Sequence, residues 1–171
     1  MLLRRFLTPP IVVSLVYWLR YRAKISPRSE VDLTDNVKFG AHCVVSSFCK
    51  IKAASGSLIL GDSVEISTHC FVHADTGGVT IGDHSMIGPL ACIVGVTYNY
   101  DTLDRPVALQ GKISRGIRIG KGVWIGAGAK VLDGADIGDN VIVTPNSVIS
   151  NRIPPNTIVQ GNPAQVIFTR R

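Results

Sequence analysis

Aliphatic residues recur at intervals of six along most of the chain, and a small residue often follows each one. They fall into groups at Phe39, Val45, Ile51; Leu60, Ile66, Val72; Ile81, Ile87, Ile93; and Ile119, Ile125, Val131, Ile137, Val143, Ile149. An amphipathic helix needs a period near 3.6, so a helical solenoid is excluded. A fixed short period instead predicts stacked coils of short strands, in which each coil buries its apolar side against its neighbours.

The breaks in this pattern define the repeating unit. Nine residues separate Ile51 from Leu60 and Val72 from Ile81, and 26 separate Ile93 from Ile119. Each break follows a third hexad, so the unit is three hexads with insertions at one recurring corner. The pattern predicts a triangular parallel β-helix, all-β in class, with a protruding loop near residues 94–116.

A second small or apolar residue lies two positions before each aliphatic one, on the same face of its strand. Three of the four cysteines, Cys43, Cys49 and Cys70, occupy this position. We therefore interpret them as small buried residues. No CxxC pair is present, which favours a reduced, cytoplasmic setting. Gly-Asp and Gly-Lys pairs such as Gly61-Asp62 are expected to supply the sharp turns at the corners.

The first 30 residues differ from the rest and are treated as a basic, apolar helix and linker, followed by the β-helix domain over residues 31–171. Pro9 and Pro10 are suited to open a helix that runs to about Ala23. Its apolar run, Ile11 to Leu19, is too short to span a bilayer, and the following arginines do not fit a signal-peptide cleavage site. Two compatible interpretations remain open: an interfacial membrane helix, and a cap on the open end of the β-helix.

The chain carries a net charge of +6, with basic residues concentrated in its first 28 positions. Such an end suits anionic lipid or an anionic ligand. Nucleic acid is not an expected partner, because no recognised binding motif accompanies the charge. We expect a cytoplasmic protein, peripheral on the inner membrane face.

The segment from Ile117 to Ile167 resembles the C-terminal half of the hexapeptide-repeat acyltransferases, which are left-handed parallel β-helices. "IRIGKGVWIGAGAKVLDGADIGDN", "VIVTPNSVIS" and "IPPNTIVQGNPAQVI" carry the resemblance, which extends over about residues 30–168. The "DRPVALQG" loop, Asp104 to Gly111, is similar to the galactoside and maltose acetyltransferases and the capsular or exopolysaccharide O-acetyltransferases.

This resemblance implies a homotrimer with active sites between subunits and acetyl-CoA as cosubstrate. The pantetheine arm is expected along one outer edge, and a C-terminal tail closes the groove. Small residues there let backbone amides approach the ligand. The implied coenzyme-binding residues are Trp124, Gly126, Ala127, Gly128, Thr144, Pro145, Asn162 and Pro163.

This chain departs from the family at the position of the catalytic base. The family places a His where this chain has Tyr98, and a phenol with a pKa near 10 is a poor base at neutral pH. His73, at the same corner one coil earlier, is one candidate base, with Asp75 two residues on. Alternatively, the acceptor is a sugar amine that needs mainly positioning. A third alternative is a catalytically inactive β-helix binding protein.

The 94–116 loop carries polar and aromatic groups suited to a sugar, and a long loop in a regular solenoid is usually functional. The candidate substrate-binding residues are Asn99, Asp101, Arg105 and Gln110. Arg105 is equally suited to an ion pair with Asp101 or Asp104. No metal is expected, because Pro89 and Val94 stand where related zinc enzymes of this fold need further ligands near His69 and His73.

Two functions remain in competition. The first is an acetyl-CoA-dependent acetyltransferase that modifies a sugar hydroxyl in surface polysaccharide, lipopolysaccharide or glycolipid biosynthesis, on a nucleotide-sugar or lipid-linked acceptor; the alternative within it is a nucleotide-sugar N-acetyltransferase. The second is a non-catalytic β-helix that binds a partner. The Trp124–Gly128 run and the Gly-Asn-Pro-Ala ending favour the first.

Overall fold

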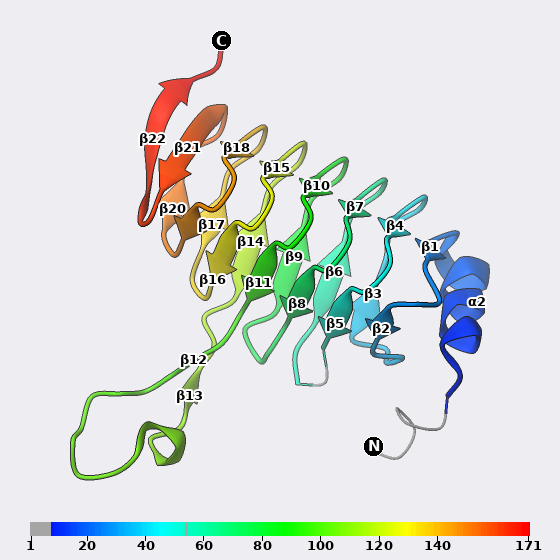
Figure 1. The fold of residues 1–171 in the computed structure, drawn as a ribbon, viewed down its shortest axis with the longest axis horizontal. Coiled ribbons are helices and arrows are strands. Elements are labelled where there is room, and N and C mark those ends of the chain that lie inside the picture. The colour runs from blue at the N-terminus through cyan, green and yellow to red at the C-terminus, as the bar shows by residue number, and fades with distance from the viewer. Residues whose placement is uncertain (1–7, 54) are drawn as a thin grey trace.

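The protein is a left-handed parallel β-helix with three flat sides, seen in a computed structural model that describes residues 8–53 and 55–171 (Figure 1). Arg4 and Arg5 of the basic N-terminus lie outside the described residues. A helix covers one end of the prism, a β-hairpin closes the other, and a long loop leaves one side.

Three parallel sheets form the sides. Sheet A comprises β1 (Lys24–Ile25), β4 (Val44–Val45), β7 (Glu65–Ile66), β10 (Met86–Ile87), β15 (Trp124–Ile125), β18 (Ile142–Val143), β21 (Thr157–Gly161) and the antiparallel β22 (Ala164–Thr169). Sheet B comprises β2 (Glu30–Val31), β5 (Lys50–Lys52), β8 (Phe71–His73), β11 (Cys92–Val94), β16 (Lys130–Leu132) and β19 (Val148–Ile149). Sheet C comprises β3 (Val37–Lys38), β6 (Leu58–Leu60), β9 (Val79–Ile81), β14 (Ile117–Ile119), β17 (Asp136–Ile137) and β20 (Arg152–Ile153).

The sixfold pattern places its aliphatic residues inside the prism. Ile51, Ile93, Ile125 and Ile137 are fully buried, and the small residues two positions earlier lie beside them in one continuous core. Each coil alone has too little apolar surface to bury, so stacking provides the hydrophobic stabilisation. The insertions after β5, β8 and β11 all fall between sheets B and C, as the spacing predicts.

The first coil begins earlier than the expected boundary at residue 31. β1 pairs with β4 and β2 pairs with β5, so Ile25 and Val31 already occupy core positions. The sixfold pattern does not reveal this coil, because its apolar residues stand isolated among polar ones and because Val31 and Phe39 are eight residues apart.

The corner glycines were expected to supply the sharp turns, and this explanation is wrong. The left-handed backbone lies two residues later, at positions such as Ser63, His84 and Asn140. Gly61 is needed because a Cβ there would lie 2.2–2.7 Å from atoms of Asp83 in the next coil. The following acid then bonds along the stack: the carboxylate of Asp62 accepts from the Ala41 N–H at 2.7 Å.

The N-terminal helix α2 (Pro10–Tyr21) caps the open end, which confirms that prediction. Tyr17 is buried, donates its hydroxyl to the Asp32 carbonyl at 2.7 Å, and packs edge-on against Phe39. The burial of Cys43, Cys49 and Cys70 is confirmed as well.

Candidate functional site

The residues expected to bind coenzyme A follow one corner of the prism, which we name the A–B edge. Gly126, Ala127 and Gly128 link β15 to β16, and Thr144 and Pro145 link β18 to β19 directly beneath them. The backbone holds this stack together, since Gly126 donates its N–H to the Val143 carbonyl at 2.8 Å. The structure therefore brings these sequence-predicted residues into one column.

The A–B edge has no room for larger side chains at its glycines. A Cβ on Gly126 would lie 2.6 Å from both the nitrogen of Pro145 and the carbonyl oxygen of Val143. Gly128 has a φ of +67°, which an L side chain rarely adopts. Within the described chain, the Ala127 N–H has no hydrogen-bond partner, so a backbone donor remains available at the edge.

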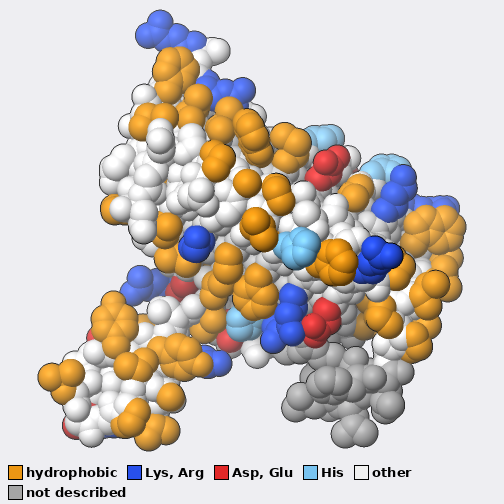
Figure 2. Space-filling model, viewed as in Figure 1, with side chains coloured by type: hydrophobic (Ala, Val, Ile, Leu, Met, Phe, Trp, Pro, Cys, Tyr) orange, Lys and Arg blue, Asp and Glu red, His pale blue; other side chains and the backbone are white. Residues whose placement is uncertain are grey.

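Trp124 lies on the outer face of sheet A beside this edge. In register with it are Met86 on one side and Ile142 on the other, and Figure 2 shows hydrophobic side chains gathered over these strands. A hollow of about 220 Å³ lies here, lined by residues that include Met86, Gly88 and Trp124. Sequence reasoning missed Met86, although it occupies the same hexad position as Trp124, one coil earlier.

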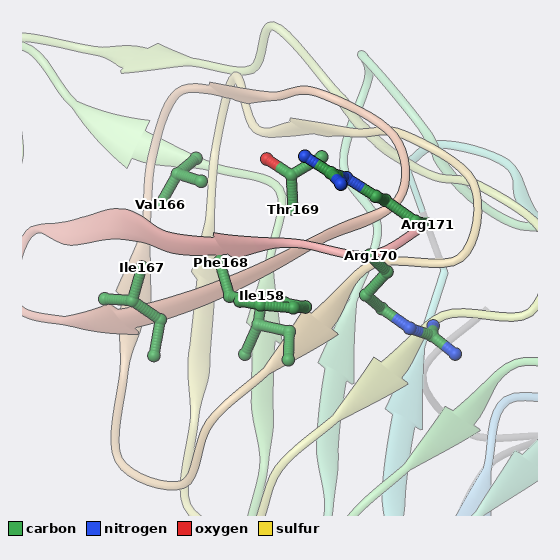
Figure 3. A pocket seen from close by; sticks show the side chains of 7 residues that line it. All are labelled: Ile158, Val166, Ile167, Phe168, Thr169, Arg170 and Arg171. Carbon is green, nitrogen blue, oxygen red and sulfur yellow. The ribbon is translucent and has the colours of Figure 1, made fainter.

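Asn162 and Pro163 form the turn between β21 and β22, joined by a cis peptide bond. The turn adjoins the A–B edge, because Gly161 donates its N–H to the Ser147 hydroxyl at 3.1 Å. A larger hollow of about 990 Å³ lies by the other end of β22, lined by residues such as Ile158, Phe168 and Arg170 (Figure 3). It is therefore separate from the candidate coenzyme edge.

The candidate base, His73, lies at the B–C corner, at the end of β8. Desolvation lowers its pKa below the ordinary value; nearby Asp75 opposes this effect, whereas the cations Lys52 and Lys112 reinforce it. A lowered pKa keeps the imidazole neutral near pH 7, which a general base requires.

Lys52 and Lys112, two cations that act on His73, are further residues of the candidate site that sequence reasoning missed. Lys52 is paired in register with His73 across β5 and β8, and Lys112 belongs to the base of the long loop. The repeat could have identified Lys52, because this residue occupies the same position as His73 one coil earlier. Two cations, Lys52 and Lys112, therefore stand with two acids, Asp75 and Asp32, around the candidate base.

The long loop leaves the prism through the antiparallel pair β12 (Thr97–Tyr98) and β13 (Lys112–Ile113), and it carries a short 3-10 helix η1 (Val107–Leu109). Tyr98 is 43% exposed, and the Lys112 ammonium lies 5.5 Å from the centre of its ring. Tyr98 thus belongs to the root of the loop, close in the chain to the B–C corner.

Several candidate substrate residues hold the loop itself. The Gln110 side chain bonds the backbone of Thr102 and Arg105, and Asn99 donates to the Gln110 carbonyl at 3.1 Å. Arg105 pairs with Asp104 at 3.1 Å, one of the two ion pairs expected for it. Asp101 is exposed.

The carboxylate of Asp75 accepts the Thr76 N–H at 2.7 Å, which fixes the corner next to His73. Within residues 8–53 and 55–171, no group of three or more His, Cys, Asp or Glu side chains is arranged to hold a metal ion.

The two halves of the candidate site lie at different corners of one chain. From Gly128 at the A–B edge to Asp133 at the B–C corner the chain advances by five residues through β16 (Lys130–Leu132), which spans roughly 17 Å at about 3.3 Å per residue. A thioester held at the A–B edge is therefore out of reach of His73 in the same coil stack.

Residues 116–151 match the family model described as bacterial transferase hexapeptide (six repeats). These residues include Trp124 and the whole A–B edge from Gly126 to Pro145. The chain thus carries the hexapeptide repeat of this transferase family.

Solved structures with the same fold include the N-acyltransferase AntD of Bacillus cereus in complex with dTDP and 3-hydroxybutyryl-CoA. It is 16% identical, with a TM-score of 0.79 over 92% of this chain and 87% of that one. A variant of GDP-perosamine N-acetyl transferase from Caulobacter crescentus, in complex with CoA and GDP-perosamine, is 22% identical with a TM-score of 0.66. The match covers 85% of this chain and 56% of that one.

A maltose O-acetyltransferase from Clostridium difficile 630 is 27% identical, with a TM-score of 0.66 over 79% of this chain and 67% of that one. At these identities the first two matches establish a shared fold.

Proposed function

We propose that this chain, a left-handed β-helix carrying the bacterial transferase hexapeptide repeat, is an acetyl-CoA-dependent acetyltransferase that acylates a sugar. The observation that carries the proposal is the A–B edge, where the closely packed Gly126 and Gly128 flank Ala127, whose N–H has no partner in the described chain, beside the half-exposed Trp124. The similar AntD and GDP-perosamine N-acetyl transferase structures hold 3-hydroxybutyryl-CoA and CoA, and the names of the two similar acetyltransferases give GDP-perosamine and maltose as their acceptors.

The A–B edge suits the long pantetheine arm because its features repeat along the prism axis. The free N–H of Ala127 offers a hydrogen bond to an amide carbonyl, and Trp124 offers an apolar surface beside it. Asn162 and Pro163 close the C-terminal end of the same edge. Bound there, the thioester supplies the activated acetyl group.

His73 supplies the proton transfer in this proposal. Its neutral imidazole takes the proton from the acceptor hydroxyl as that oxygen bonds to the acetyl carbon, and it returns the proton to the departing sulfur. Asp75 lies close enough to favour the imidazolium that forms in between. Desolvation, reinforced by Lys52 and Lys112, lowers the pKa of His73 and so keeps the resting imidazole neutral.

The separation of the two edges supports a homotrimer in which one chain contributes His73 and its neighbour the A–B edge. The loop has side chains suited to such a contact, since Tyr100 and Leu109 are more than 70% exposed and Leu103 is fully exposed. Exposed apolar side chains clustered on one protruding loop are typical of protein–protein contacts.

The two lysines beside His73 favour an acceptor that carries phosphate. Lys52 and Lys112 face the same corner, and a nucleotide-linked or lipid-linked sugar presents a diphosphate beside its sugar. With such carriers as acceptors, we propose a role in the biosynthesis of surface polysaccharide, lipopolysaccharide or glycolipid, in the cytoplasm.

N-acetylation of an amino sugar is the second candidate. Tyr98 stands where related acetyltransferases are expected to carry a His, and an unprotonated amine needs less help from a base than a hydroxyl does. An acceptor panel of neutral and amino nucleotide-sugars separates the two reactions, with release of the CoA thiol as the readout.

Complementation between variants tests the shared site. His73→Ala and Trp124→Ala chains, each with little activity alone, are refolded together into mixed oligomers. We expect activity to reappear in the mixture, because one interface then combines an intact His73 with an intact Trp124. Mixtures no more active than their parents would contradict the shared-site arrangement.

A further inference from the structure

Helix α2 has two opposite sides with different partners. Its inner side packs on the end of the prism through Val13 and Tyr17, with Tyr21 partly buried beside them. The hydrogen bond from Tyr17 to the Asp32 carbonyl and its ring contact with Phe39 fix the rotation of the helix. The opposite side must therefore face away from the prism.

That outer side is a stripe of large apolar side chains. Its members are 40–66% exposed and follow the spacing i, i+1, i+4, i+7, i+8: Ile11, Val12, Leu15, Trp18 and Leu19. At 100° per residue they cover about 120° of the helix surface, opposite the buried side. We name these five residues the outer stripe. Folding of the chain gains nothing from exposing them, so the stripe indicates a partner.

The charge around the outer stripe identifies the partner's chemistry. Residues 1–28 contain six basic side chains and no acidic one. The guanidinium of Arg22 lies 5.2 Å from the centre of the Trp18 ring, at the border of the stripe. The charge of Arg20 is balanced by an ion pair with exposed Asp35 at 3.1 Å. The side chains of Lys24 and Arg28 are exposed. An apolar stripe with a cationic border is complementary to an anionic lipid surface.

We propose that α2 docks the prism on anionic membrane by inserting the outer stripe into the interfacial layer, with the helix axis along the surface. Twelve residues extend about 18 Å, less than the roughly 30 Å of a bilayer core. In the described part of the chain, no helix is long and apolar enough to cross a membrane. A second copy is a poorer occupant, because end-to-end stacking would oppose two basic N-termini.

Vesicle co-sedimentation of the full-length chain tests this docking surface. The probes are vesicles of phosphatidylcholine alone and of phosphatidylcholine with 30% phosphatidylglycerol. We expect binding to the anionic vesicles at least tenfold stronger than to the neutral ones, and weaker binding as salt rises from 0.1 to 0.5 M. Failure to bind the anionic vesicles at 0.1 M salt would overturn the proposal.

The matched variants are Leu15→Glu with Leu19→Glu on the outer stripe and Ile59→Glu on sheet C, all at exposed positions. The stripe variant should lose at least tenfold in vesicle affinity, whereas Ile59→Glu should bind like the parent. Equal binding by the stripe variant would refute the proposal, as would a halved solution mass, which would identify a second copy as the occupant. Acetyl transfer to a soluble acceptor should be unchanged, so failure here is distinguishable from failure of the proposed function.

Discussion

Gly126→Ala tests whether close contact between coils shapes the A–B edge. The added Cβ would lie 2.6 Å from two backbone atoms of the next coil, whereas ordinary contact begins at 3.4 Å, so one coil must move by roughly 0.8 Å. Those atoms belong to Val143 and Pro145, and the Val143 carbonyl is bound to Gly126 itself at 2.8 Å. Relief by side-chain rotation is therefore blocked.

Overpacking of this kind costs about 1–3 kcal/mol, which lowers the melting temperature of a chain this long by roughly 2–12 °C. If the site tolerated Ala, the free energy of unfolding would instead rise by about 0.4–1 kcal/mol, because the unfolded chain would be less flexible. The sign of the stability change therefore distinguishes the two cases. Urea unfolding followed by circular dichroism measures it, and acetyl-CoA titration should show weakened binding. Ala127→Ser, one position along the same edge, is the control and should stay within about 0.5 kcal/mol. An unchanged or raised urea midpoint for Gly126→Ala would refute the reasoning.

Five further variants examine the base and the core. His73→Ala should lower kcat by at least about a hundredfold, while Tyr98→Phe should retain most activity; steady-state kinetics decides, and the opposite ranking would assign the base to Tyr98. Lys52→Ala removes a charge that disfavours the imidazolium, so the pKa of His73 rises and the acid limb of the kcat/KM profile moves to higher pH. Asp75→Asn removes a charge that favours the imidazolium, so the pKa falls and the limb moves to lower pH. Identical limbs in both variants would exclude His73 as the titrating group. Ser85→Ala removes a buried hydroxyl that bridges two backbone groups, at 2.9 and 3.2 Å, and should cost about 1–3 kcal/mol in urea unfolding; no loss would indicate that water replaces the bridge.

The repeat was predictable because its physical cause is periodic. Every inward position must hold an aliphatic or small side chain, and every insertion must leave the stack undisturbed, so the breaks before Leu60 and Ile81 revealed the three-sided coil. The first coil was not predictable in this way, because Ile25 and Val31 are not part of a continuous run of sixfold repeats. The corner glycines were found but misexplained, since contact between coils 21 residues apart is not visible along the chain.

The A–B edge followed from a motif whose residues are near in sequence, so the structure keeps them together. The corner around His73 depends on groups from separate coils and from the loop. Lys112 reaches it only because β12 and β13 pair. Likewise, Gln110 was grouped with substrate residues by its chemistry, although its amide bonds the loop's own backbone.

Calorimetric titration of the full-length protein with acetyl-CoA tests the central claim most directly. The account predicts saturable binding with a dissociation constant below a millimolar, one site per chain, and a loss of at least tenfold in affinity for Trp124→Ala. No binding at millimolar acetyl-CoA by the folded protein would contradict the acetyltransferase assignment.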